Sequence, residues 1–193
     1  MAQYFTLFIS AAVVNNFVLT RFLGLCIFFG VSKSLSASLG MGMAVTSVIT
    51  FSSILAWVVY HFVLLPFHLE FLKTVVFVLL IASFVQLLEM VIKKYAPALY
   101  NMWGIYLVLI ATNCIVLAVP LLNAESSFPF VKSVVNALGS GVGFALAIIL
   151  MSSIREKLVY ADVPKALEGL GVAFILGGML ALAFLGFSGM IKI

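Results

Sequence analysis

The fold is decided by stretches without charged side chains, and the clearest is residues 39–65, which read LGMGMAVTSVITFSSILAWVVYHFVLL. An α-helix needs about 20 apolar residues to cross the hydrocarbon core of a bilayer. The whole chain has this character, since 65% of its 193 residues are hydrophobic and only 8% are charged. A water-soluble domain needs far more polar surface. We therefore predict an integral membrane protein and exclude a soluble enzyme, a nucleic-acid-binding protein and a disordered chain.

Charged residues and prolines divide the sequence into six such stretches, as expected for helices separated by loops. The predicted spans are 1–20 with its continuation to 29, 39–65, 71–92, 100–122, 134–154 and 170–191. The first residues lack the basic segment of a cleaved signal peptide, so we expect them to remain as a span. The predicted fold is an all-α integral membrane protein with six transmembrane helices in a single domain, 1–193.

Basic residues in the loops predict the orientation, because they are enriched on the cytoplasmic side of a membrane. The loops after the first, third and fifth spans contain Lys33, Lys93, Lys94, Arg155, Lys157 and Lys165. The termini and the other two loops contain Lys73, Lys132 and Lys192. This excess predicts that both termini lie outside the cytoplasm.

The two halves of the chain, about 1–95 and 96–193, share a weak sequence repeat. Residues of the first half recur at one constant offset, Lys33-Ser34, Leu39-Gly40 and Gly42 as Lys132-Ser133, Leu138-Gly139 and Gly141. Asn16 and Asn113 are related by nearly the same offset, although some matches arise by chance in sequences rich in Gly and Leu. Each half would contain three spans, an odd number, so the halves would be inverted. Inverted repeats place functional sites near the middle of the membrane, on interrupted helices.

Two predicted spans contain clusters that break their apolar character. In the first span the cluster consists of Asn15, Asn16, Thr20, Arg21 and Gly24, followed by Cys26. In the fourth span it consists of Thr112 and Asn113, followed by Cys114. Polar groups in hydrocarbon are costly and usually functional, and asparagine caps helices, so we predict interrupted first and fourth helices. Isolated hydrogen bonds between helices are the alternative interpretation.

The sequence contains only two cysteines, Cys26 and Cys114. They could pack as small hydrophobic residues, form a disulfide or bind a metal. Straight helices would hold the two thiols at different depths, so a shared metal site requires broken helices. Zinc and iron–sulfur sites usually take four protein ligands. His61 and His68 are not well placed to supply the missing two, because both lie near the outer end of the second span. A metal bound here would therefore lie at an interface with a second chain.

Several motifs carry a resemblance that extends over nearly the whole chain. They are VNNFVL at 14–19, FLGLC at 22–26, GVSK at 30–33, TNC at 112–114, IRE at 154–156, ADVP at 161–164 and GFSG at 186–189. The chain resembles the family of A-type membrane subunits of the Rnf complex. The E-type membrane component of the sodium-translocating NADH:quinone reductase is a close relative, but the C-terminal motif is more similar to the Rnf proteins.

This resemblance implies six helices in an inverted repeat, paired with a homologous membrane subunit of opposite topology, the E-type Rnf subunit, among other Rnf subunits. It implies that Cys26 and Cys114, with two cysteines of the partner, hold one 2Fe–2S cluster within a bacterial cytoplasmic membrane. Complexes of this family pass electrons between ferredoxin and NAD⁺ and translocate Na⁺ or H⁺. The chain would then relay electrons as one component of a redox-driven ion translocase. The candidate supporting residues are Asn15, Asn16, Arg21, Thr112 and Asn113.

Other signals have plainer interpretations. Arg21 would either compensate the charge of a cluster or extend to the membrane surface. Gly139 and Gly143 form a GxxxG motif, which favours close helix packing over nucleotide binding. The charged residues from Arg155 to Asp162 predict a solvated loop.

A secondary transporter is the alternative function, because transporters also combine inverted repeats with broken helices. A transporter would be expected to place substrate ligands on several spans, whereas the polar residues here are concentrated in two. A structural scaffold is a third hypothesis, but it does not account for paired asparagine and cysteine positions.

Overall fold

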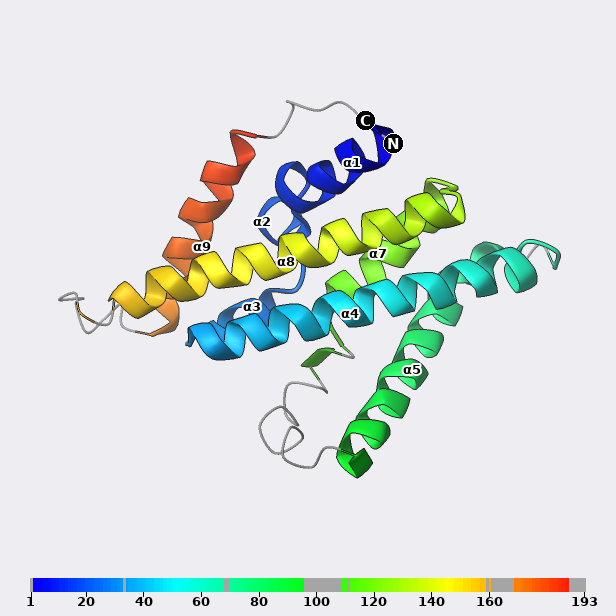
Figure 1. The fold of residues 1–193 in the computed structure, drawn as a ribbon, viewed down its shortest axis with the longest axis horizontal. Coiled ribbons are helices and arrows are strands. Elements are labelled where there is room, and N and C mark those ends of the chain that lie inside the picture. Colours follow the sequence, from blue (N-terminus) through cyan, green and yellow to red (C-terminus); the bar gives the residue numbers. More distant parts are fainter. Residues whose placement is uncertain are drawn as a thin grey trace.

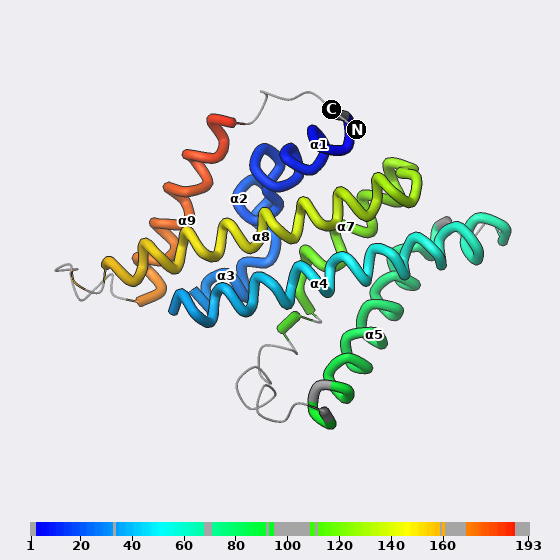
Figure 2. Tube along the Cα trace, in the orientation of Figure 1, coloured from blue at the N-terminus to red at the C-terminus, as the bar shows by residue number. Residues whose placement is uncertain are grey.

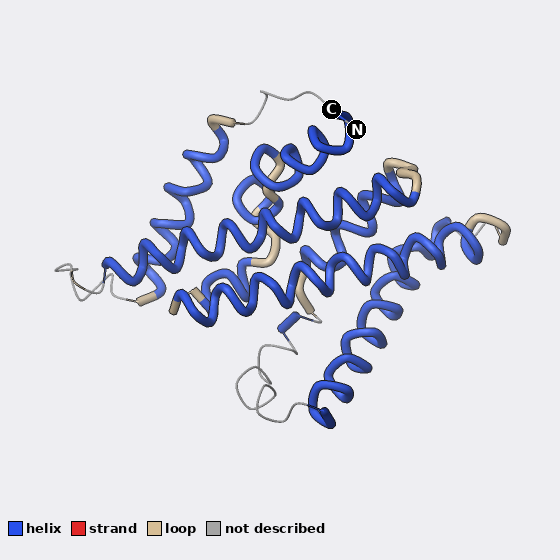
Figure 3. Tube along the Cα trace, in the orientation of Figure 1, coloured by secondary structure: helices blue, strands red, loops and turns tan. Residues whose placement is uncertain are grey.

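The fold is that of a computed structural model, and the description concerns residues 2–32, 34–67, 70–95, 109–110, 112–158, 160 and 169–187. Every regular element within these ranges is helical (Figure 3). Several predictions lie outside the described residues, including Lys33, His68, Lys165, Lys192 and most of the first half of the predicted fourth span.

Three helices in the described part of the chain are long and apolar enough to cross a membrane. They are α4 (Leu35–Val59), which continues through a π-helical turn (Tyr60–Leu64), α5 (Lys73–Tyr95) and α8 (Phe130–Leu158). A 3₁₀ turn (Glu70–Leu72) leads into α5. These helices contain nearly all of the second, third and fifth predicted spans.

Helices α4 and α8 lie side by side and run in opposite directions (Figures 1 and 2). Glycines allow this close approach. A Cβ atom on Gly42 would lie 2.8 Å from the Cβ atom of Ala145, and one on Gly141 would lie 2.7 Å from Cγ2 of Thr46. Small residues at such positions let two helix backbones approach each other, so this pair forms the centre of the molecule.

The first predicted span is divided into four short pieces. They are α1 (Ala2–Ile9), a π-helical turn (Ser10–Val14), α2 (Phe17–Arg21) and α3 (Leu25–Val31). The GxxxG motif of α8 packs against the first two pieces, since a Cβ on Gly139 would lie 2.9 Å from the carbonyl oxygen of Phe8 and one on Gly143 would lie 2.7 Å from that of Ala12. The predicted role of this motif in close packing is confirmed.

Two shorter apolar helices complete the described fold, α7 (Cys114–Glu125) and α9 (Leu170–Leu185). Helix α7 packs against α4, α5 and α8, whereas α9 packs against α2. Pro120 lies inside α7.

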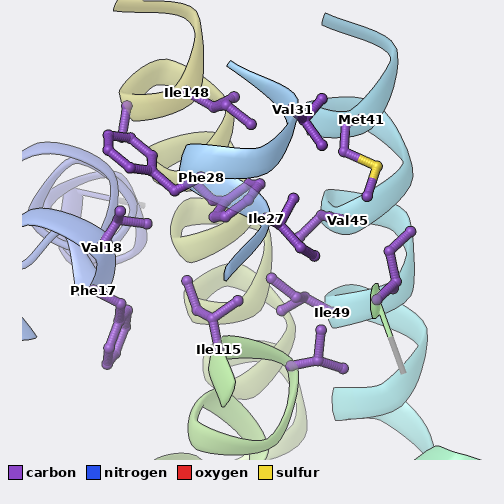
Figure 4. Packing of buried hydrophobic residues seen from close by; sticks show 14 of the residues in the cluster. Phe17, Val18, Ile27, Phe28, Val31, Met41, Val45, Ile49, Ile115 and Ile148 are labelled. Atoms are coloured by element: carbon purple, nitrogen blue, oxygen red, sulfur yellow. The ribbon is translucent and has the colours of Figure 1, made fainter. Parts of the chain in front are cut away.

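Helix α3 is embedded in the hydrophobic core even though it is short. Figure 4 shows Ile27 and Phe28 of α3 between Ile148 of α8 on one side and Val45 and Ile49 of α4 on the other. All five side chains are fully buried. The core therefore fixes the position of the segment that contains Cys26.

Candidate functional site

Asn16 forms the first break in the chain, where the π-helical turn ends and α2 begins. Its Oδ1 atom accepts a hydrogen bond from the backbone N–H of Val18 at 3.1 Å, as an N-cap residue does. Its Nδ2 atom donates to the carbonyl oxygen of Gly143 at 2.8 Å and to that of Ala12 at 3.3 Å. Asn15 precedes it, and its Nδ2 atom donates to Oγ of Ser10 at 3.2 Å. The predicted interruption of the first helix is confirmed.

A second break separates α2 from α3. Phe22 and Gly24 both adopt left-handed backbone conformations, with φ of 55° and 79°. Glycine is favoured at such a position, and at Gly24 space imposes a further limit, because a Cβ atom there would lie 2.9 Å from Oδ1 of Asn113. The start of α3 is thus packed directly against a residue that is distant in sequence.

Asn113 forms the corresponding break before α7. Leu109 and Ile110 are helical, Asn113 is not, and its Oδ1 atom accepts a hydrogen bond from the N–H of Ile115 at 3.2 Å. Because Gly24 packs against this side chain, the breaks of the first and fourth predicted spans meet at one place. Figure 3 shows both breaks as loop segments between helices.

Both cysteines lie in the first turn of a helix that begins at this meeting point. Cys26 is the second residue of α3 and Cys114 is the first residue of α7. Both thiols are free and exposed, whereas the next residues, Ile27 and Ile115, are fully buried. The interpretations as buried hydrophobic residues and as a disulfide are therefore wrong. The helices present the two thiols at the surface.

A cleft of about 700 Å³ lies beside Cys114, between α5 and α7. Its lining is mostly apolar, with polar side chains at a few positions. These positions are Gln86, Glu89, Thr112 and Asn113. Leu23, which precedes α3, also lines the cleft. The site thus combines exposed thiols with an apolar cleft that is lined by a few polar side chains.

Comparison with known proteins identifies the family. A family model described as "Rnf-Nqr subunit, membrane protein" matches residues 4–191. The chain belongs to the Rnf-Nqr family. Its assignment as a membrane protein, predicted from composition, is confirmed.

Relatives match the Rnf-Nqr chain over its full length. It is 84% identical to the A-type subunit of the proton-translocating ferredoxin:NAD(+) oxidoreductase complex of Clostridium ljungdahlii, over 193 residues and 100% of both chains. It is 51% identical to the A-type subunit of the ion-translocating oxidoreductase complex of Glaesserella parasuis, over 100% of both chains. The protein of the same name from Erwinia tasmaniensis is 48% identical over 192 residues, again 100% of both chains.

The other predicted site residues of this Rnf-Nqr chain have local contacts. The guanidinium of Arg21 is exposed and lies 5.6 Å from the centre of the Phe17 ring. The hydroxyl of Thr20 donates to the carbonyl oxygen of Asn16 at 2.7 Å. Thr112 is exposed, and its hydroxyl donates to the carbonyl oxygen of Leu109 at 3.4 Å. These contacts brace the breaks.

The sequence did not reveal the role of Arg155. Its Nη1 atom donates to the carbonyl oxygen of Phe29 at 3.1 Å and to Oγ of Ser32 at 2.8 Å. The prediction of a solvated loop at this position is wrong, because Arg155 is in the last turn of α8 and is half-buried against the end of α3. Burying a charged guanidinium is costly unless it forms hydrogen bonds, and these two bonds offset that cost for Arg155. Arg155 therefore anchors the helix that carries Cys26.

A buried polar network, also missed from sequence, connects three helices near the C-terminal end of α7. Nδ2 of Asn123 lies 3.0 Å from the hydroxyls of Ser53 and Ser133, and Nδ2 of Asn136 donates to Oδ1 of Asn123 at 2.7 Å. A cavity of about 310 Å³ adjoins this network. His61 lines the same cavity and stacks on Trp57. The network joins α4, α7 and α8 through neutral groups.

Proposed function

We propose that the chain is the A-type subunit of an ion-translocating ferredoxin:NAD⁺ oxidoreductase complex, and that it relays electrons across a bacterial cytoplasmic membrane. Family membership and full-length similarity to relatives with this name support the proposal. The observation that most supports the electron-relay role is the packing of Gly24 against Asn113. This contact brings together the N-terminal ends of α3 and α7, which contain Cys26 and Cys114. The complex would couple electron transfer to translocation of Na⁺ or H⁺.

Cys26 and Cys114 would supply two of the four thiolate ligands of a 2Fe–2S cluster. The residues fit this group, because thiolates are the ligands of such clusters and both thiols are free and exposed. Among the described residues no three His, Cys, Asp or Glu side chains form a cluster that could hold a metal. The remaining ligands would come from a homologous membrane protein of opposite topology, the E-type Rnf subunit. When bound, the cluster would supply a one-electron redox step.

The chain itself would fix the positions of the two thiols and provide a polar environment that suits an anionic cluster. The positive end of the α7 helix dipole lies beside Cys114, the first residue of the helix, and it favours negative charge nearby. The buried neighbours Ile27 and Ile115 fix the helix faces on which the thiols lie. Little rearrangement of this chain would then be needed when the cluster changes its redox state.

The two halves, about 1–95 and 96–193, are proposed to be inverted repeats within one six-helix transmembrane domain. Reciprocal contacts between α4 and α8 support this arrangement. Gly42 packs on Ala145, while Thr46 packs on Gly141. Gly141 is the repeat counterpart of Gly42, and Ala145 is the counterpart of Thr46 at the same offset. A two-fold relation between antiparallel helices would produce such a pair of contacts.

The cluster assignment can be tested on the assembled complex, purified from the membrane in wild-type form and as Cys26→Ser and Cys114→Ser variants. We expect each variant to lose one 2Fe–2S signal in EPR spectra after reduction, with a matching loss of iron and acid-labile sulfide. Ser47→Ala, on an exposed part of α4, is the control and should keep the signal. Survival of every 2Fe–2S signal in an intact Cys26→Ser complex would overturn the assignment.

A further inference from the structure

Among the described residues at the breaks, Nδ2 of Asn113 is the one buried side-chain nitrogen or oxygen atom that has no hydrogen-bond partner. Asn113 is only 4% exposed, and its Nδ2 atom has no hydrogen-bond partner among the described residues. A buried donor without a partner destabilises a folded protein. A group that binds next to it and offers an acceptor would remove this cost.

Comparison with Asn16 shows that helix capping does not explain why residue 113 has an amide NH₂ group. Both asparagines use Oδ1 to cap the next helix, and serine or aspartate would do so equally well. At Asn16 the Nδ2 atom also forms a hydrogen bond, because it donates to the carbonyl oxygen of Gly143. At Asn113 the same atom is buried without such a bond in the described part of the chain.

The surroundings of Asn113 indicate the acceptor. Asn113 and the adjacent Cys114 line the same cleft. Helix α7, which has 12 residues, begins at Cys114, so the positive end of its helix dipole lies beside this thiol. Donors at this position suit an acceptor of negative charge held by the exposed thiol. A sulfur atom of an iron–sulfur cluster has this character.

On the basis of the proposed function, we propose that the side-chain amide of Asn113 donates a hydrogen bond to a sulfur atom of the 2Fe–2S cluster held by Cys26 and Cys114. Hydrogen bonds to the sulfur atoms are one of the factors that set the potential of such clusters. The bond strengthens when reduction adds negative charge, so it favours the reduced form. Asn113 therefore raises the reduction potential of the cluster.

The test uses the intact complex with Asn113→Ser, which keeps a capping oxygen and removes the amide. We expect about a tenfold decrease in the equilibrium constant for reduction, which is a shift of about 59 mV to more negative potential for one electron. EPR-monitored redox titration measures this shift. Loss of one exchangeable proton coupling in ENDOR spectra of the reduced cluster is a second expected result. Ser47→Ala, at an exposed position of α4, is the control and should leave both measurements unchanged.

The outcomes separate this inference from the proposed function. If the wild-type complex has no cluster that depends on Cys26 and Cys114, the proposed function fails. If that cluster is present and Asn113→Ser alters neither its potential nor its proton coupling, only the inference about Asn113 fails. Asn113→Asp also keeps the cap and removes the donor. If both variants abolish assembly of the complex, the Asn113 amide is required for assembly, and the inference that it sets the potential of the cluster is overturned.

Discussion

Gly143 fulfils two requirements with one backbone position. The absence of a side chain lets the carbonyl oxygen of Ala12 approach α8, and its own carbonyl oxygen accepts the hydrogen bond from Asn16. The first break is therefore attached to the middle of α8 through atoms of the main chain. Any side chain at this position would separate the two segments.

We expect Gly143→Ala to destabilise the protein by about 1–3 kcal/mol, the usual range for overpacking in a dense core. The added methyl group would lie 2.7 Å from the Ala12 carbonyl oxygen, which is backbone and cannot rotate away. Thermal unfolding of the purified protein in detergent would show the loss as a lower melting temperature. Gly178→Ala in α9 is the control, because a Cβ there meets no atom within 4 Å. Equal melting temperatures for the two variants would contradict the prediction.

Arg155→Met should release the C-terminal end of α3 while keeping an apolar side chain of similar length. Hydrogen bonds to charged groups contribute about 1.5–3 kcal/mol, and this change removes those to Phe29 and Ser32. We expect amide hydrogen exchange within α3 to become faster. Mass spectrometry of peptides covering α3 measures it. Lys157→Met, at an exposed position two residues further along α8, should leave the exchange rates at wild-type values.

The sequence was sufficient to identify the individual caps but not the contacts between them. Asparagine in an apolar stretch is a local signal, and both Asn16 and Asn113 cap helices as predicted. The packing of Gly24 on Asn113 and the anchoring of α3 by Arg155 join residues that are far apart in the chain. Such contacts depend on how helices pack, so no local pattern indicates them.

At the scale of helices, charge-free stretches located α4, α5 and α8 but misplaced their ends by a few residues. Helix α8 begins at Phe130 and ends at Leu158, whereas the predicted span was 134–154. The additional residues include charged ones, which end a transmembrane stretch but do not end a helix. Conversely, the first span is divided into short helices, because helix breaks follow from caps and left-handed residues and not from hydropathy.

The α4–α8 contact predicts a compensating pair of substitutions. Gly42→Ala should lower the melting temperature, because its new Cβ would lie 2.8 Å from the Cβ of Ala145. Ala145→Gly in the same chain removes that atom, so the double variant should recover part of the loss. Melting temperatures of the two single variants and the double variant give the coupling between the positions. A double variant whose loss equals the sum of the single losses would show that the two residues do not interact as described.

For the whole molecule, orientation follows from charge and not from packing. Basic residues favour the cytoplasmic side, and they predict that both termini lie outside. We expect alkaline phosphatase to be active when fused after residue 193 in bacterial cells. The same reporter fused after Tyr160, just beyond the end of α8, should be inactive because it would remain in the cytoplasm. Activity of the fusion after Tyr160 combined with inactivity of the C-terminal fusion would reverse the assigned orientation.

The position of α3 between α4 and α8 has a consequence for biosynthesis. A chain is made from its N-terminus, so the ribosome completes Cys26 long before it reaches the residues of α8 that cover α3 and the Arg155 that holds its end. Until then, α3 cannot form its final packing contacts with α8. The proposed cluster site would therefore be completed late, after most of the polypeptide has entered the bilayer. A truncated product would expose the unpacked helix α3 to quality-control proteases.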